Sequence, residues 1–483
     1  MGRFFNYFSS IHYTELYYKD LRHQILPTQS HRLYTYHAMY DDTIAAISTP
    51  PGEGGIGIVR LSGPDALVIT SKVFTDKLED HRVVHGYIID PGTREVIDEV
   101  LVCYMSAPHT YTAEDVVEIN CHGGPMPLQA ILESVLKHGA RLANPGEFTL
   151  RAFLNGRIDL AQAESVLDII RAKTQASLRV AMQGLKGNLS NHIKAVRTNL
   201  INALAYLTAR IDFPEDEIEK QDIVPILKDA RDKLREIVTS ADQGIIYRQG
   251  IKTAIVGRRN VGKSSLLNRL LKQERAIVSP IPGTTRDTLE EIVNIRGVPF
   301  VLIDTAGMDK RQGRVESLGV ERSRQAIAQA DFVLMVIDSS SPLRSTDLDI
   351  INMLSEKAAL VAANKSDLKQ RANLVDISFD MVHVSALTGE GIDHLEDKMA
   401  EFVLGGKGSF CDTLLVSNPR HKACLEQAIA YLDQALSGLA SQMPDDFVTI
   451  DLTSALNTLG EITGETVTNE LLEIIFSNFC IGK

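Results

Sequence analysis

The chain lacks the marks of a membrane-spanning or secreted protein. No uninterrupted apolar run approaches the roughly 18 residues that a membrane-spanning helix needs. The five cysteines are odd in number and include no Cys-x-x-Cys pair, which argues against a disulfide framework or a zinc site. The tyrosine- and histidine-rich N-terminus has no apolar signal core. These absences favour a reducing, cytoplasmic setting and no membrane contact.

An excess of positive charge is also missing. The formal net charge is −12 at pH 7, whereas a protein that grips nucleic acid over a broad surface usually carries a basic face. The acidic balance does not exclude an RNA substrate, but it predicts that any RNA is held locally or largely by a partner. The 44% of hydrophobic and 23% of charged residues are ordinary for a soluble globular protein.

Changes in hydrophobic periodicity divide the chain into segments. Residues 39–156 combine short β-rich runs, Gly/Pro turns and one amphipathic stretch, which indicates a small α+β domain. Residues 157–250 and 407–483 follow helical spacing. Residues 251–406 alternate strands and helices, as in a parallel sheet flanked by helices. We therefore expect a multidomain α+β and α/β protein whose α/β domain is inserted into a helical domain. Residues 1–38 are expected to be a disordered extension or a non-native start.

A complete P-loop opens the α/β segment. The strand Thr253–Val256 runs into residues 257–264 (GRRNVGKS), which is the strand–loop–helix context that this motif requires. Its glycines let backbone N–H groups surround phosphate oxygens, and the helix N-terminus adds its dipole. We expect Lys263 to reach the β- and γ-phosphates and the hydroxyl of Ser264 to bind Mg²⁺.

Later motifs identify the nucleotide as GTP. The stretch 304–307 (DTAG) follows a strand, so Asp304 is placed to hold Mg²⁺ through water and the Gly307 N–H to sense the γ-phosphate. In the stretch 364–367 (NKSD), Asp367 can accept from guanine N1–H and the 2-amino group, neither of which adenine offers. The stretch 385–387 (SAL) follows the next strand, and its N–H groups could meet guanine O6. Together these motifs predict a Ras-like P-loop GTPase domain.

The attacking water lacks its usual partner. Many GTPases orient that water with a glutamine directly after the Asp-x-x-Gly motif, but this position is Met308. Asp309 and Glu316 are candidates to replace it, and a solvated charge is the alternative for both. Upstream, Thr285 lies where a switch segment is expected, and its hydroxyl can join Mg²⁺ when the γ-phosphate is present. The residues expected to contact GTP are Asn260, Val261, Gly262, Lys263, Ser264, Ser265, Ser279, Pro280, Ile281, Pro282, Gly283, Thr284, Thr285, Asp304, Thr305, Ala306, Gly307, Asn364, Lys365, Ser366, Asp367, Ser385, Ala386 and Leu387.

Motifs that are not general to GTPases carry a resemblance to one family. They are residues 49–55 (TPPGEGG), 145–148 (PGEF) with 151–155 (RAFLN), and the terminal 479–483 (FCIGK). With them the chain closely resembles the tRNA modification GTPases of the MnmE (TrmE) family, from about Asp42 to Lys483. The resemblance implies GTP hydrolysis that serves, with an FAD-dependent partner, to install an aminomethyl-type (carboxymethylaminomethyl) group at C5 of the wobble uridine of certain tRNAs. It also implies that a folate carries the one-carbon unit, that the N-terminal domain binds the folate and forms a homodimer, and that the partner joins in a heterotetramer or larger complex.

The resemblance assigns further residues by motif. It implies that K⁺ is bound by Asn260, Ser279, Ile281 and Thr284, and that Glu316 orients the water. Arg60, Glu118, Arg157 and Lys483 fall on the positions that bind 5-formyl-tetrahydrofolate or a related folate. Two positions depart from the common family residue, since Ser279 replaces threonine and Arg157 replaces lysine, which differs from arginine in geometry. Without the family, each folate candidate is equally a surface charge or a local ion pair.

Some alternatives remain open on the sequence alone. Cys480 is either a nucleophile that Lys483 activates or a buried apolar cysteine. A GTP-dependent switch in ribosome assembly would share the GTPase domain, but such proteins carry a basic RNA-binding appendage that the last helical segment does not show. A dynamin-like membrane GTPase is disfavoured because no hydrophobic paddle or lipidation motif is present. Folate binding discriminates the first alternative from the family function.

Overall fold

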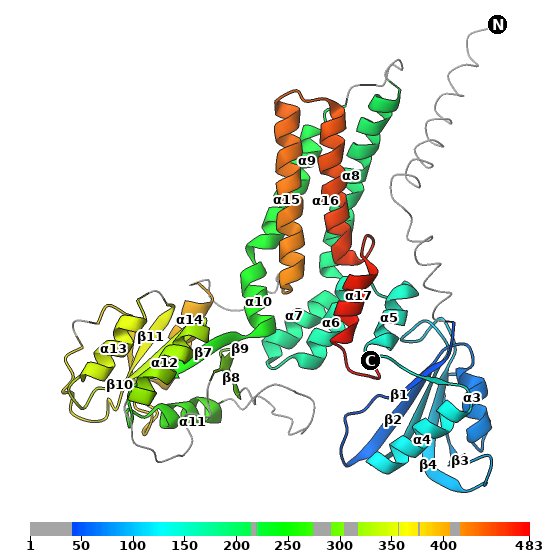
Figure 1. Cartoon of the computed structure of the whole chain (residues 1–483), viewed down its shortest axis with the longest axis horizontal. Coiled ribbons are helices and arrows are strands. Elements are labelled where there is room, and N and C mark those ends of the chain that lie inside the picture. The colour runs from blue at the N-terminus through cyan, green and yellow to red at the C-terminus, as the bar shows by residue number, and fades with distance from the viewer. Residues whose placement is uncertain are drawn as a thin grey trace. The chain divides into compact units, whose positions relative to one another are not determined.

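The computed structural model describes residues 41–213, 219, 221–273, 291–303, 317–355, 357–374, 377–405 and 416–483. The chain forms two compact units. The first contains residues up to 167 with 184–238 and 420–483, and the second contains residues 168–183 with 239–419. Each unit has one six-stranded sheet, and Figure 1 labels the helices and strands.

The sheet of the first unit runs in the order β3-β4-β5-β2-β1-β6. All neighbouring strands are antiparallel except β1 and β6. Because side chains alternate across a strand, Val59, Leu61 and Ile119 are buried towards helices α3 and α4, while Arg60 and Glu118 lie on the opposite face. The elements are β1 (Ile44–Ile47), β2 (Gly54–Ser62), α3 (Ala66–Val73), β3 (Arg82–Ile89), β4 (Val96–Met105), β5 (Val116–Gly123), α4 (Pro125–Lys137) and β6 (Arg141–Leu142).

Long helices complete the first unit. Buried leucines recur every three or four positions on α8 (Leu200, Leu204, Leu207) and on α16 (Leu452, Leu456, Leu459). This spacing gives each helix one apolar stripe, and the two helices pack against each other (Figure 1). The helices are α5 (Glu147–Leu154), α6 (Leu160–Arg171), α7 (Gln175–Leu185), α8 (Asn188–Asp212), α9 (Val224–Thr239), α15 (Pro419–Ala440), α16 (Asp445–Thr463) and α17 (Asn469–Ser477).

The second unit is an α/β domain with the strand order β12-β11-β10-β7-β9-β8. Neighbouring strands are parallel except β8 and β9. Strands β10 and β11 are buried at every position, as expected of parallel strands covered on both faces. The elements are α10 (Ala241–Gln249), β7 (Ile251–Val256), α11 (Lys263–Gln273), β8 (Glu291–Ile295), β9 (Val298–Leu302), α12 (Ser317–Gln329), β10 (Phe332–Asp338), α13 (Ser345–Met353), β11 (Ala359–Asn364), β12 (Met381–His383) and α14 (Ile392–Val403).

The predicted fold class is confirmed: an α+β domain, a helical domain and an inserted P-loop α/β domain are all present. The grouping of helix α7 differs from the expected boundary at residue 250. Most of α7 packs with the α/β domain, because Ser177 Oγ donates to the Tyr247 carbonyl at 2.6 Å and Thr174 Oγ1 donates to the Gly297 carbonyl at 2.9 Å. Val180 joins the apolar core of the same domain.

Candidate functional site

The P-loop connects strand β7 to helix α11. Gly257 and Gly262 have φ values of 143° and 100°, which side chains rarely adopt. A Cβ on Gly257 would lie 2.3 Å from the Val336 carbonyl oxygen, and one on Gly262 would lie 2.2 Å from Asn364 Nδ2. Only glycine therefore lets the loop lie this close to β10 and to the guanine motif.

Lys263 is the first residue of α11, and its ammonium turns back to the loop. Its Nζ donates to the carbonyls of Gly257 at 2.7 Å and Arg258 at 2.9 Å. Burial lowers the pKa of Lys263, and the nearby charge of Arg259 lowers it further. The loop thus places a desolvated cation beside the backbone N–H groups that begin α11, an arrangement suited to phosphate oxygens.

The guanine motif is tied directly to the P-loop. Asn364 is 2% exposed, and its Nδ2 donates to the Val261 carbonyl at 2.7 Å. Its Oδ1 accepts from the Ala386 N–H at 2.9 Å, which connects the motif to the following loop. In that loop Ser385 Oγ donates to Asp367 Oδ1 at 2.6 Å. One buried asparagine therefore joins the loops expected to hold phosphate and base.

The described residues bring together the predicted contacts of the P-loop and of both guanine loops. Among these predicted contacts, Leu387 is 81% exposed at the tip of the last loop. The remaining predicted residues lie outside the described part of the chain, so their roles stay predictions. They are Ser279, Pro280, Ile281, Pro282, Gly283, Thr284, Thr285, Asp304, Thr305, Ala306, Gly307, Asp309 and Glu316.

A second polar cluster lies on the open face of the N-terminal sheet. The register of β2 and β5 sets Arg60 directly opposite Glu118, and Arg60 Nε donates to Glu118 Oε1 at 2.8 Å. Arg60 Nη1 also donates to the carbonyl of Gly482 at 3.3 Å, and Ser48 Oγ donates to the same carbonyl at 3.2 Å. The C-terminal tail is thereby fastened to the sheet.

Glycines permit this close seating of the tail. Gly482 has a φ of 90°, and a Cβ there would lie 2.4 Å from the Ile47 carbonyl oxygen. The Gly146 N–H donates to the Cys480 carbonyl at 3.3 Å. Lys483 is consequently half-buried. Burial and the charge of Arg60 lower the pKa of Lys483, while Glu118 and Cys480 act in the opposite direction.

Two aromatic rings adjoin the cluster. The guanidinium carbon of Arg157 lies 5.1 Å from the Tyr111 ring centroid, and that of Arg60 lies 5.8 Å from the Phe148 ring centroid. Burial raises the pKa of Tyr111, with Thr149, Arg157 and Arg60 opposing the shift. The predicted folate residues Arg60, Glu118, Arg157 and Lys483 are therefore neighbours in the structure. The sequence gave no functional signal for Tyr111, whereas Phe148 belongs to the quoted PGEF motif.

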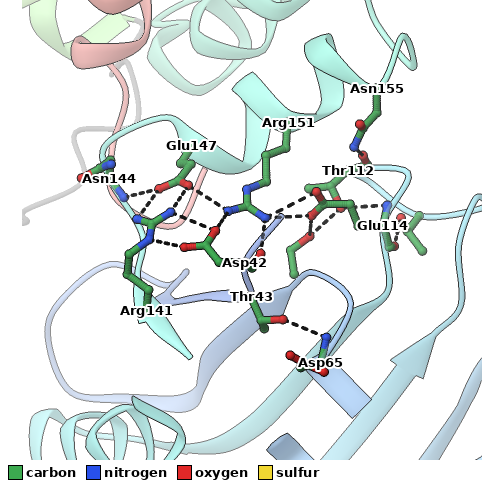
Figure 2. Close-up of polar contacts among 12 residues, drawn as sticks. Asp42, Thr43, Asp65, Thr112, Glu114, Arg141, Asn144, Glu147, Arg151 and Asn155 are labelled. Atoms are coloured by element: carbon green, nitrogen blue, oxygen red, sulfur yellow. Dashed lines mark hydrogen bonds and ion pairs between the residues drawn. The ribbon is translucent and has the colours of Figure 1, made fainter. Parts of the chain in front are cut away.

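A buried ionic network holds helix α5, which carries Phe148, on the sheet (Figure 2). Arg151 is 1% exposed and donates to Asp42 Oδ1 at 2.6 Å and to Glu147 Oε1 at 3.0 Å. Arg141 contacts the same two carboxylates, at 2.5 Å each. Burial of Glu147 opposes its ionisation, but the bonds from Arg141, Asn144 and Arg151 outweigh it and lower its pKa.

The cysteines show no metal or disulfide chemistry in the described residues. Cys480 is exposed, so the interpretation of a buried apolar cysteine is wrong. Cys121 is buried and bonded to the Gly57 carbonyl, while its neighbour His122 is paired with Asp98. No group of three or more His, Cys, Asp or Glu side chains in the described ranges is arranged to hold a metal ion. Nor does this part of the chain contain a helix long and apolar enough to cross a membrane.

The glycine-built P-loop, joined through Asn364 to a guanine motif at the edge of a parallel sheet, defines the class of P-loop GTPases. Residues 43–157 match the family described as the GTP-binding protein TrmE N-terminus, and residues 160–480 match the MnmE helical domain. A tRNA modification GTPase MnmE of Chloroflexus aurantiacus is 52% identical over 452 residues, covering 92% of this chain and 100% of the relative. The MnmE of Ligilactobacillus salivarius is 50% identical over 455 residues, covering 92% and 98%. The chain belongs to the MnmE family of tRNA modification GTPases, and it is a GTP-hydrolysing enzyme.

Proposed function

We propose that this GTPase acts with an FAD-dependent partner to install a carboxymethylaminomethyl-type group at C5 of the wobble uridine of certain tRNAs. Membership of the tRNA modification GTPases supports the substrate class. The observation that carries the finer proposal is the second polar cluster, because it gives the chain a site for a one-carbon carrier besides its GTP site. The whole complex is then a homodimer of this chain joined by the partner.

The second cluster has the chemistry that a reduced folate such as 5-formyl-tetrahydrofolate requires. Both contacts from Arg60 go to Oε1 of Glu118, so Oε2 can accept from the amino and N–H donors of a pterin. Arg157 and Lys483 supply positive charge for the carboxylates of the glutamate tail. Tyr111 and Phe148 offer flat apolar surfaces beside these polar groups. Folate bound there supplies the one-carbon unit.

At the GTP site, residues of the P-loop bind and orient the phosphates. Lys263 and the N–H groups of the loop hold the β- and γ-phosphates, while Ser264 and Thr285 would hold Mg²⁺. Asp367 selects guanine. Glu316 orients the attacking water in place of the missing glutamine, since Met308 offers no hydrogen bond of the needed strength. Asn260 fits a K⁺ ligand because it stands in the loop at a φ of 63° with an amide oxygen on a short side chain; Ser279, Ile281 and Thr284 would complete that site.

The homodimer is supported by exposed apolar side chains on the open face of the N-terminal sheet. Val83 is 63%, Leu101 46% and Tyr87 40% exposed. The register of β3 and β4 places them on this face together, away from α3 and α4. Apolar side chains gathered on one face of a sheet indicate a surface that a partner covers. We infer that a second copy of this chain covers it.

The folate proposal is tested by shortening the tail. Deleting residues 480–483 removes Lys483 and the Gly482 carbonyl, so 5-formyl-tetrahydrofolate binding to the full dimer should weaken about tenfold or more by calorimetry. GDP binding should stay unchanged. Lys483→Met should weaken the folate alone, and Lys137→Met, on exposed α4, is the matched control that should not. Unchanged folate affinity in the shortened chain would remove the tail from the site. No folate binding at all, with GTP binding intact, would favour an assembly switch.

A further inference from the structure

A buried aspartate stands between the two loops of the GTP site. Asp338 is the last residue of β10 and is 7% exposed. Its Oδ2 accepts from Lys365 Nζ at 2.7 Å, and its Oδ1 accepts from the backbone N–H and the hydroxyl of Ser340, at 3.0 and 2.6 Å. Burial opposes the ionisation of Asp338, but the bonds from Lys365 and Ser340 outweigh it and lower its pKa. The carboxylate is therefore charged and held in place.

The same carboxylate faces the P-loop through Arg258, the second residue of that loop. Arg258 Nη2 lies 3.7 Å from Asp338 Oδ2, and Arg258 Nε lies 3.2 Å from Asp347 Oδ2. Asp347 is itself buried at the start of α13, where its Oδ2 accepts from the Arg344 N–H at 3.0 Å. The guanidinium also donates to Ser341. Two buried acids thus fix the side chain that follows the first glycine of the P-loop.

On the other side, Asp338 holds a residue whose backbone is strained. Lys365, inside the guanine motif, has a φ of 66°, a left-handed conformation that costs a lysine roughly 1 kcal/mol or more. Its ammonium bond to Asp338 anchors the side chain in that conformation. The residue after Asp338 ties the motif again, because Ser339 N and Oγ donate to the Asn364 carbonyl at 2.9 and 2.8 Å.

We propose that Asp338 is a positioning residue of the nucleotide site, which couples the P-loop, through Arg258, to the guanine-recognition motif, through Lys365. Occupation of the base loop then favours the phosphate-binding conformation of the P-loop, and the reverse holds by linkage. Asp338 touches neither base nor phosphate in this scheme. It sets the spacing of the two loops that do.

The coupling is measured by a double-mutant cycle on full-length protein. Arg258→Met and Lys365→Met each remove one partner of Asp338, and GDP dissociation constants are determined with Mg²⁺ present. Each single variant should weaken GDP about tenfold, and the double variant should fall short of the product of the two losses by about fivefold or more. In an Asp338→Asn background the two losses should simply multiply, because the residue that connects them is gone.

Controls separate positioning from stability. A purely stabilising role would lower the thermal midpoint of all variants and leave the two losses multiplicative with Asp338 present, which would overturn the proposal. If Asp338→Asn does not fold, the cycle in the Asp338 protein decides alone. Asp397→Asn is the matched control, since Asp397 is 63% exposed and paired with Arg296 in the same domain. It should leave GDP affinity and the cycle unchanged.

Discussion

At the scale of single residues, the selection of guanine depends on one carboxylate. Asp367 is positioned by Ser385, whose hydroxyl donates to its Oδ1 at 2.6 Å. The Asp367→Asn variant can donate to the 2-oxo group of xanthine but cannot accept from the guanine 2-amino group. GTP affinity should fall roughly 10- to 100-fold while affinity for xanthosine triphosphate rises, since an unpaired buried polar group costs roughly 1–3 kcal/mol. Fluorescent-nucleotide titration measures both, and unchanged GTP affinity would remove Asp367 from the site.

Residue roles were predictable wherever a motif is local in sequence. The P-loop and the guanine motif carry their geometry with them, since a glycine or an aspartate at a fixed offset after a strand has few other purposes. Arg60, Glu118 and Lys483 are far apart in the chain, and only the family resemblance placed them in one site. Asp338 was missed because an aspartate at a strand end is ordinary until its neighbours Arg258 and Lys365 are known.

At the scale of elements, hydrophobic periodicity located most of the strands and long helices within a few residues. The buried runs of β10 and β11 were clear because a strand covered on both faces is continuously apolar. Strand β3 was not predicted. It is an edge strand with exposed Val83, His85 and Tyr87, so its sequence lacks a plain inside–outside pattern. The short helix α5 is buried at nearly every position and has no polar face to reveal its period.

The helical domain has a charged contact between helices that predicts its acid stability. Glu164 of α6 bonds to His421 and Arg420 at the start of α15, at 2.6 Å each. Burial opposes its ionisation, yet these two cations lower the pKa of Glu164 to about 2 from 4.5. A carboxylate with a depressed pKa stabilises the fold above its unfolded pKa, and this stability is lost as pH falls through the folded value.

The stability of the helical domain should therefore be level near neutral pH and fall between about pH 5 and 2, with Glu164 contributing roughly 3 kcal/mol. Glu164→Gln should unfold at lower urea at pH 7, because His421 and Arg420 lose their partner, and should show a shallower acid slope. Circular dichroism in urea at several pH values measures this. Glu426→Gln, an exposed residue on α15, is the control. A variant with an unchanged acid slope would contradict the assignment.

At the scale of the whole molecule, the proposal requires two copies whose GTPase domains cooperate through K⁺. An arginine finger, which accelerates many GTPases by roughly 10³–10⁵, has no counterpart in the P-loop, where Asn260 stands instead. The GTPase rate of the full-length protein should be about tenfold or more higher in KCl than in matched NaCl, because the smaller Na⁺ suits the same ligands poorly. Asn260→Ala should lose this difference. Equal rates in the two salts, or an Asn260→Ala variant that keeps its K⁺ response, would refute it.

The central claim is that GTP hydrolysis by this chain serves the modification of wobble uridine. The most direct measurement is the mass of the wobble nucleoside in tRNA from cells that lack the protein, with the wild-type chain or Lys263→Ala returned. The account predicts that the modified uridine disappears, returns with the wild-type chain and stays absent with Lys263→Ala, which cannot bind the phosphates properly. Wobble uridine of unchanged mass in the cells that lack the protein would contradict it.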